Sequence, residues 1–252
     1  MSFQDSVKSN IQALGKDTLL EKKSIDWLFE TAKYNYSYNF SCLGRPIIQY
    51  PQDMVALQEL IWEIKPDLII ETGIAHGGSL ILSASMLAML DMCDAIETGV
   101  TINPKESKRK VLGIDIDIRT HNRIAIEAHP MASRIQMIQG SSIAPDIIEQ
   151  LNVVAANYSK ILVILDSNHT HDHVLAELQV FAPLTSVGSY CCVFDTVIED
   201  IPKQDRPWGP GESPKTAVWE YLKTHPEFEI DKSIQHKLLI TVAPDGYLRR
   251  LK

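Results

Sequence analysis

The chain has 252 residues, 45% of them hydrophobic, and a formal net charge of −8 at pH 7. A chain of this length can bury a sizeable core as one α/β domain, whereas its acidity and the lack of a basic stripe argue against a nucleic-acid groove. The longest apolar stretch, residues 80–90, is shorter than a membrane span and the polar N-terminus resembles no signal peptide, so we expect no membrane partner.

Residues 1–33 have the apolar spacing of one or two amphipathic helices. We expect residues 1–50 to form a helical and irregular extension that packs on the main domain or on a second subunit, which would give a homo-oligomer. Residues 51–252 form the main domain in this interpretation. Its first helix is expected from Asp53 to about residue 64, because Pro66 follows.

The main domain continues with a strand, a glycine turn and a helix. Residues 68–70 are an apolar run that fits a strand buried on both faces. Gly73 has no Cβ, so a ligand can approach its backbone, and Gly77 with Gly78 permits a sharp turn into the helix. The free N–H groups of that helix's first turn face the same crevice.

Strands and helices alternate along the rest of the chain. Strands are expected at residues 110–115, 134–139, 160–165 and 189–194, and helices at residues 119–128, 144–151, 170–181 and 215–224. This alternation predicts βαβ units and a mostly parallel sheet. Residues 228–231 and 238–243 are expected as the last two strands, before a turn into residues 247–251.

Two further segments carry weaker signals. The proline-rich residues 201–214, around Trp208, are too long for a simple connection and predict a lid or a substrate loop. Cys191 and Cys192 are adjacent in an apparent buried strand and should point to opposite faces. The four cysteines form no Cys-x-x-Cys pair, which indicates reduced thiols in a cytoplasmic protein.

The glycine turn alone leaves its ligand open. A Gly-x-Gly-x-x-Gly dinucleotide site would need glycine at position 75, where Ala75 stands. Glu71 at the strand end would repel a pyrophosphate and attract the ammonium group of an amino-acid-bearing cofactor. This favours S-adenosylmethionine (SAM) over NAD, and an NAD-dependent oxidoreductase or a tight turn without any ligand remains an alternative.

Polar side chains follow the carboxyl ends of the expected strands, where doubly wound sheets bind their ligands: Glu71, Asp115, Ser141, Ser142, Asp166 with His169, and Asp195. The carboxylate of Asp115 can accept hydrogen bonds from both hydroxyls of a ribose. Asp166 and Asp195 would end adjacent strands, and two carboxylates so close repel each other unless a cation or a proton joins them. Oxygen ligands with open coordination positions suit Mg²⁺.

The histidine-rich residues 169–173 are similar to the His-x-His-x-Asp-His zinc motif of metallo-β-lactamase-like hydrolases, although one residue is missing. A zinc hydrolase that uses His169, His171 and His173 is therefore an alternative. Otherwise His171 and His173 are ordinary residues at a helix start. His169, three residues after Asp166, is the best candidate for a general base.

The chain resembles the cephalosporin hydroxylase and rhamnosyl O-methyltransferase family, a branch of the class I SAM-dependent methyltransferases. The resemblance runs from about Tyr38 to the C-terminus and is carried by residues 38–40, 44–49, 51–53, 71–73, 76–79, 113–115, 166–170 and 188–190. It implies a Rossmann-like sheet of seven strands whose last pair is antiparallel, with helices on both faces. It also implies methyl transfer from SAM to a hydroxyl of a small natural product or sugar, with Mg²⁺ assisting in many members.

The same resemblance assigns roles to residues of this chain. Glu71 and Gly73 would face the methionine part of SAM, Asp115 the ribose and Ser142 the adenine. The full expected cofactor-binding set is Glu71, Gly73, Ala75, Gly77, Gly78, Ser79, Asp115, Ser141 and Ser142. Asp166 and Asp195 would hold the metal, and His169 together with Asp166 would be catalytic. A SAM-binding subunit without catalytic activity is a further alternative.

One position departs from the acidic pair that related metal-dependent methyltransferases have at the end of the fifth strand. This chain has Phe194 before Asp195. A benzyl group cannot ligate a cation, so we expect a metal held by two protein carboxylates and more water, or held weakly, or absent. Phe194 should face either the core or the acceptor, on the side opposite to Asp195.

Overall fold

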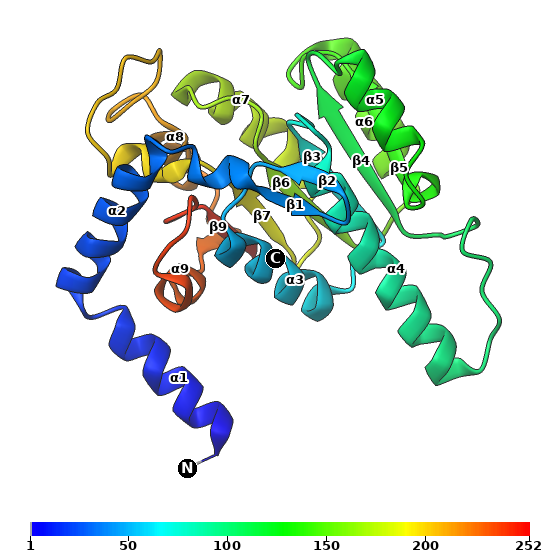
Figure 1. The fold of residues 1–252 in the computed structure, drawn as a ribbon, viewed down its shortest axis with the longest axis horizontal. Helices are drawn as coiled ribbons and strands as arrows, with labels where there is room; N and C mark the ends of the chain where they lie inside the picture. Colours follow the sequence, from blue (N-terminus) through cyan, green and yellow to red (C-terminus); the bar gives the residue numbers. More distant parts are fainter. Residues whose placement is uncertain (1) are drawn as a thin grey trace.

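Seven strands form one sheet in the computed structural model, which describes residues 2–252 (Figure 1). They lie side by side in the order β5 (Ile135–Gln139), β4 (Lys110–Asp115), β3 (Leu68–Thr72), β6 (Ile161–Leu165), β7 (Tyr190–Val193), β9 (Tyr247–Arg250) and β8 (Phe228–Ile230). The first five are parallel, and β9 is antiparallel to both of its neighbours. The expected mostly parallel sheet with an antiparallel C-terminal strand pair is confirmed.

Helices cover both faces because the strand side chains alternate between two apolar cores. One core is covered by α3 (Pro51–Ile64), α4 (Gly78–Thr98), α5 (Thr120–Glu127) and α9 (Lys232–Leu238), and the other by α6 (Pro145–Ala155), α7 (His171–Phe181) and α8 (Pro214–Leu222). Within β3, Ile69 belongs to the first core and Ile70 to the second. Cys191 and Cys192 divide in the same way, as predicted.

The chain reaches this sheet through two helices and a hairpin. α1 (Phe3–Leu14) buries no residue, contacts α9 and projects from the body of the molecule (Figure 1). α2 (Thr18–Ala32) follows, and its Leu28 joins the first core. After the 3₁₀ helix η1 (Tyr36–Asn39), β1 (Phe40–Cys42) and β2 (Arg45–Ile47) pair as a hairpin against α4.

Helix α4 is longer than its apolar stretch indicated, so the argument that it is too short for a membrane was wrong. Its 21 residues make it the one helix within residues 2–252 that could cross a membrane by length and composition, a test that core helices of soluble proteins also pass. In this structure α4 packs against α3, β4 and the hairpin. Near its C-terminal end, Asp91 forms ion pairs with Arg109 and Arg134, which tie the helix to the body of the protein.

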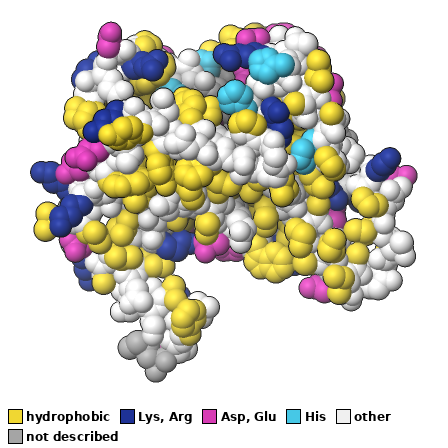
Figure 2. All heavy atoms as spheres, in the orientation of Figure 1, with side chains coloured by type: hydrophobic (Ala, Val, Ile, Leu, Met, Phe, Trp, Pro, Cys, Tyr) yellow, Lys and Arg dark blue, Asp and Glu magenta, His cyan; other side chains and the backbone are white. Residues whose placement is uncertain are grey.

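An apolar surface remains on the layer of α3 and α4. Trp62, Met89, Met92 and Ile96 are all about half exposed or more. Figure 2 shows hydrophobic side chains in a band across the middle of this face of the molecule. Such a surface is typical of interaction sites, but the homo-oligomer stays a prediction.

Residues 238–243 do not form the strand that was expected from their apolar sequence. α9 extends to Leu238, and the segment beyond it is irregular. Its polar groups bond elsewhere, because the hydroxyl of Thr241 and the N–H of Val242 both donate to the buried carboxylate of Asp53. The place next to β7 is taken by β9 instead.

The close approach of β3 to β6 gives a stability prediction. Gly73 has a φ of +89°, and a Cβ there would overlap the carbonyl oxygen of Asp166. Gly73→Ala is therefore expected to lower the free energy of unfolding by roughly 3 kcal/mol or more, since a left-handed backbone and overpacking both add cost. Gly188→Ala is the control, because Gly188 has a φ of +81° and open space around it. Urea unfolding of both variants measures the difference, and equal losses would contradict the steric argument.

Candidate active site

A cavity of about 520 Å³ opens at the carboxyl ends of β3, β4, β6 and β7. It brings together nine of the residues predicted from the sequence: Gly73, Ala75, Gly77, Gly78, Ser79, Asp115, Asp166, His169 and Asp195. Glu71, Ser141 and Ser142 do not line it. The cavity is also lined by Tyr38, Gln49 and Tyr50, and by Gln204 and Arg206 of the predicted lid segment.

The glycine turn between β3 and α4 is held open by the end of β4. One oxygen of Asp115 accepts hydrogen bonds from the N–H groups of Ile74, at 2.7 Å, and Ala75, at 3.1 Å. Ala75 has a left-handed φ of +45°, which is costly for a residue with a Cβ and must be fixed by its neighbours. Asp115 thus shapes the turn, in addition to any bond it makes to a ligand.

A second clamp, which the sequence analysis missed, grips the same turn from outside. The guanidinium of Arg45 donates to the carbonyl of His76 at 2.6 Å and to the side-chain oxygen of Asn122 at 3.1 Å. The amide of Asn122 donates in turn to the carbonyl of Ala75 at 2.9 Å. Residue 45 lies in one of the segments that carry the family resemblance, but only the fold brings it to position 76.

Glu71 lies beneath the turn, with Ser79 between its carboxylate and the cavity. Glu71 is 1% exposed, one of its oxygens accepts from the Ser79 hydroxyl, and the other has no partner. Burial raises the pKa of Glu71 to about 7, although the bond from Ser79 lowers it. Because the Ser79 hydrogen is committed to Glu71, the lone pairs of its hydroxyl oxygen can accept from a donor in the cavity, such as an ammonium group.

Ser141 and Ser142, both predicted to bind the cofactor, are not brought to the cavity. Ser142 is 5% exposed, and its hydroxyl lies 3.2 Å from the Nε2 atom of His173. His173 lies in turn 3.4 Å from the hydroxyl of Ser167, which does line the cavity. The side chain of His173 therefore separates Ser142 from the cavity wall. The sequence predicts that Ser142 follows a strand, but it does not show which α7 residue covers it.

Asp195 and His169 form a pair in the wall of the cavity. The Nδ1 atom of His169 lies 3.2 Å from the Oδ2 atom of Asp195, which leaves Nε2 of the imidazole for a substrate. Asp195 has a left-handed φ of +57° at the end of β7. Burial and then the charge of Asp195 raise the pKa of Asp166 well above its ordinary value. A cation between the two carboxylates would relieve this repulsion.

The donor set at this point fits Mg²⁺ better than zinc. Asp166 and Asp195 offer carboxylate oxygens, which a hard cation with several waters accepts. Phe194 is 3% exposed and belongs to the apolar core, so its side chain faces away from the cavity. Within residues 2–252 no group of three or more His, Cys, Asp or Glu side chains is arranged to hold a metal.

The three histidines of the zinc alternative point to different partners. His169 pairs with Asp195, whereas His171 lies 2.7 Å from the Thr216 hydroxyl and 3.3 Å from Glu220. His173 faces Ser142 and Ser167. The structure thus gives no support to a zinc hydrolase, because His169 precedes α7 and the two histidines within α7 contact different partners.

The predicted lid segment reaches the cavity. Glu199 fastens its far end, accepting from the N–H of Gly211 at 2.9 Å and the hydroxyl of Ser213 at 2.7 Å. The ring of Trp208 then packs edge-to-face on His169, with ring centroids 4.9 Å apart. The guanidinium of Arg206 lies over the Trp208 ring, 5.9 Å from the ring centroid. The general-base candidate is therefore in contact with the lid.

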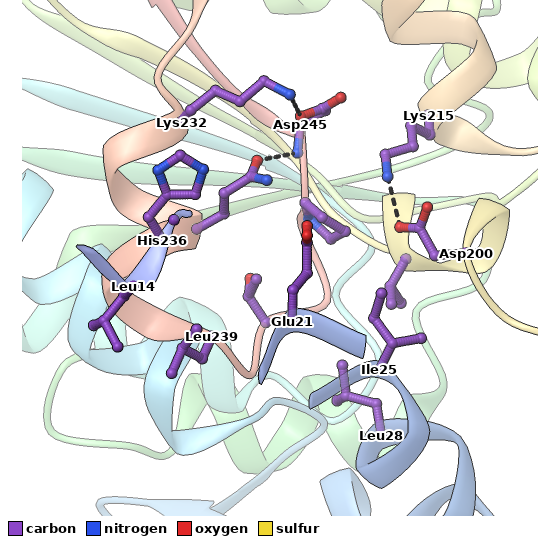
Figure 3. Close-up of a pocket in the computed structure, with 15 residues that line it drawn as sticks. Leu14, Glu21, Ile25, Leu28, Asp200, Lys215, Lys232, His236, Leu239 and Asp245 are labelled. Atoms are coloured by element: carbon purple, nitrogen blue, oxygen red, sulfur yellow. Dashed lines mark hydrogen bonds and ion pairs between the residues drawn. The ribbon is translucent and has the colours of Figure 1, made fainter. Parts of the chain in front are cut away.

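A smaller cavity of about 120 Å³ lies between α2, α9 and the start of α8 (Figure 3). Its lysines are already neutralised, since Lys215 pairs with Asp200 at 2.5 Å and Lys232 with Asp245 at 2.8 Å. It is lined by none of the predicted site residues. The cavity at the strand ends is therefore the candidate active site.

The strand order, the glycine turn after β3 and the acidic residue at the end of β4 define the class: a class I SAM-dependent methyltransferase. Within that class, the family model of "Rhamnosyl O-methyltransferase/CmcI" matches residues 34–251, and the chain belongs to this family. The resemblance seen in the sequence is confirmed.

Individual relatives agree with this assignment. A rhamnosyl O-methyltransferase of Mycobacterium bovis (strain BCG / Pasteur 1173P2) is 32% identical over 203 residues, covering 79% of this chain and 73% of its own. An apo structure of CmcI is similar in fold, with a TM-score of 0.56 and 21% identity over 85% of this chain and 77% of the other. A Mg–SAM structure of CmcI has a TM-score of 0.53 and 18% identity, covering 85% and 78%.

The buried carboxyl of Glu71 gives a pH prediction for the cofactor-free protein. An unfolded glutamate titrates at about 4.3, whereas the pKa of Glu71 in the folded protein is about 7. The folded state holds the extra proton between these values, so stability is lost as the pH rises from about 4 to 7. Glu71→Gln does not undergo this loss, and at pH 8 its free energy of unfolding is expected to exceed that of the wild type by on the order of 3–4 kcal/mol.

Urea unfolding at pH 5 and pH 8 measures the difference between Glu71→Gln and the wild type. The exposed Glu149 is the control, and Glu149→Gln is expected to follow the wild type at both pH values. A gain for Glu71→Gln that is the same at pH 5 and pH 8 would show that ionisation of Glu71 carries no cost.

Proposed function

We propose that this protein transfers a methyl group from SAM to a hydroxyl of a sugar or of a small glycosylated product. The observation that carries the proposal is the His169–Asp195 pair, which lies in the same cavity as the glycine turn. Relatives named rhamnosyl O-methyltransferase support the sugar as acceptor. Ala75 in place of the glycine of a dinucleotide site supports SAM over NAD.

Methyl transfer is an in-line displacement in which the new O–C bond forms as the C–S bond breaks. The electron pair of the broken bond neutralises the sulfonium, and the hydroxyl proton must leave the acceptor oxygen. The Nε2 atom of His169 takes this proton, because Nδ1 is held by Asp195, whose carboxylate stabilises the resulting imidazolium. The remaining work is orientation of the two reactants.

Asp166 and the second oxygen of Asp195 are the residues that would hold Mg²⁺. A Mg²⁺ ion there would lower the pKa of the acceptor hydroxyl. A Mg–SAM complex of the related CmcI supports this proposal. With Phe194 in the core, Asp166 and Asp195 are the two carboxylates that we propose as ligands, so weak binding is expected.

The acceptor side of the cavity is built for a polar ring. Tyr38 and Trp208 offer aromatic surfaces, and Gln204 offers an amide. Arg206 is the only lysine or arginine that lines the cavity within the described chain. Since the lid supplies three of these four residues, we propose that it closes over the acceptor and excludes water.

Purified protein incubated with methyl-labelled SAM and a panel of rhamnosides tests the function directly. Label transferred to a sugar oxygen, reduced on addition of EDTA and restored by Mg²⁺, is the expected result. SAM binding without transfer to any acceptor would favour a non-catalytic subunit. Calorimetric binding of NAD in place of SAM would overturn the cofactor proposal.

Replacement of the proposed base gives a second test. His169→Ala is expected to lower kcat on the order of 10²–10⁴-fold, because proton removal loses its acceptor, while the affinity for SAM stays close to wild type. His171→Ala is the matched control, since His171 bonds to Thr216 outside the cavity. Steady-state kinetics and calorimetry measure both effects. Equal losses in the two variants would remove His169 from the mechanism.

A further inference from the structure

Asp53 is a buried carboxylate that the proposed mechanism does not use. It lies in the first turn of α3 and is 0% exposed. It accepts hydrogen bonds from the Thr241 hydroxyl, from the N–H of Val242 at 3.0 Å and from the Tyr247 hydroxyl at 3.0 Å. Burial raises the pKa of Asp53 to about 6, even though these three bonds lower it. Because burial of this carboxylate costs free energy, we expect it to hold part of the structure in place.

The bond to Val242 leads toward the active site. The carbonyl of Val242, which residue also lines the cavity, accepts from the N–H of Val197 at 3.1 Å. Two residues further on, the carbonyl of Pro244 accepts from the Thr196 hydroxyl at 2.6 Å. The irregular segment that Asp53 holds is therefore the backing of the 3₁₀ helix η4 (Thr196–Glu199).

Asp195 stands directly before this 3₁₀ helix, in its left-handed conformation. A non-glycine residue keeps such a conformation only where its surroundings over-determine it. Thr196, the next residue, is 0% exposed and is pinned by the segment that Asp53 holds. On its other side, the Asp195 carboxylate holds the Nδ1 atom of His169.

We propose that Asp53 is a positioning residue that fixes Asp195, and through it His169, by way of the 241–244 segment. The inference rests on the proposed function for its catalytic meaning. Its physical content is a chain of hydrogen bonds from Asp53 to Val242, from Val242 to Val197, and so to the backbone beside Asp195. The negative charge of Asp53 is not required by this argument, but its acceptor oxygen toward Val242 is.

Four variants separate the acceptor oxygen of Asp53 from its negative charge. Asp53→Ala removes every acceptor, whereas Asp53→Asn keeps one oxygen for the N–H of Val242 and turns its NH₂ toward hydroxyls that can rotate to accept. Tyr247→Phe removes one donor to the same carboxylate and leaves the Val242 bond intact. Thr196→Val removes a second bond between the 241–244 segment and η4, the one from the Thr196 hydroxyl to the carbonyl of Pro244, and keeps the test decisive should Asp53→Ala fail to fold.

Two readouts are compared across the four variants. The first is kcat with the SAM dissociation constant. The second is the ¹⁵N NMR signals of the His169 imidazole, assigned with His169→Gln. Asp53→Ala is expected to lower kcat by about 10²-fold, the scale of a misplaced catalytic group, with SAM affinity unchanged and the Nδ1–H signal of His169 lost or shifted. Thr196→Val is expected to do the same to a smaller extent, and Asp53→Asn and Tyr247→Phe should remain close to wild type.

Wild-type His169 signals in Asp53→Ala, or in Thr196→Val where the alanine variant does not fold, would overturn the proposal. A loss in Asp53→Asn as large as in Asp53→Ala would also overturn it, because the charge would then matter and not the bond. The NMR comparison needs neither acceptor nor turnover. If the wild type methylates no sugar, the proposed function fails while the role of Asp53 is still decided.

Discussion

The site depends on how closely the carboxyl end of β3 approaches that of β6. The two strands pair in register, with Thr72 opposite Leu165, and the N–H of Asp166 donates to the carbonyl of Thr72 at 3.0 Å. Gly73 then leaves the sheet with no side chain to separate it from the backbone of Asp166. The turn proposed to receive the cofactor and the Asp166 carboxylate proposed to face the acceptor are therefore adjacent in the fold. No lid movement is needed to bring them together, and orientation of this kind supplies much of the catalytic effect in a two-substrate transfer.

Electrostatics gives the same cavity its preference for a cationic ligand. Burial raises the pKa values of Glu71 and Asp166, and Asp195 adds to the second shift. The ionised forms of these carboxyl groups are therefore unfavourable until a positive group arrives. A sulfonium cofactor with an ammonium group, with or without Mg²⁺, supplies that charge, whereas a pyrophosphate would add to the repulsion. Binding of the cofactor and relief of buried charge are the same event in this arrangement.

Local patterns predicted the parts of the site that lie at strand ends. An apolar run precedes each of Asp115, Asp166 and Asp195. A parallel sheet brings the carboxyl ends of its strands to one edge, independently of the rest of the sequence. Residues held by distant partners could not be found in this way. The Arg45 clamp spans 31 residues to His76, and the bond from Val242 to Asp53 spans 189. The latter also explains the false strand at residues 238–243, because the N–H of Val242 bonds to Asp53 of α3 and not to a neighbouring strand. The position of Ser142 after a strand was predicted correctly, but the residue that covers it, His173, comes from α7.

The phenylalanine at position 194 changes what Asp195 must do. Where a strand ends in two acids, one can serve the cation while the other orients the base. Here the benzyl side chain is in the core, and the single carboxylate faces both His169 and Asp166. A cation bound tightly to Asp195 would withdraw its charge from the imidazolium that forms on proton transfer. A cation bound loosely, mostly through water, leaves that charge available. In the proposed mechanism, the departure from the acidic pair therefore favours the base at the expense of the metal. The surrounding structure then has to maintain the exact position of one carboxylate, that of Asp195.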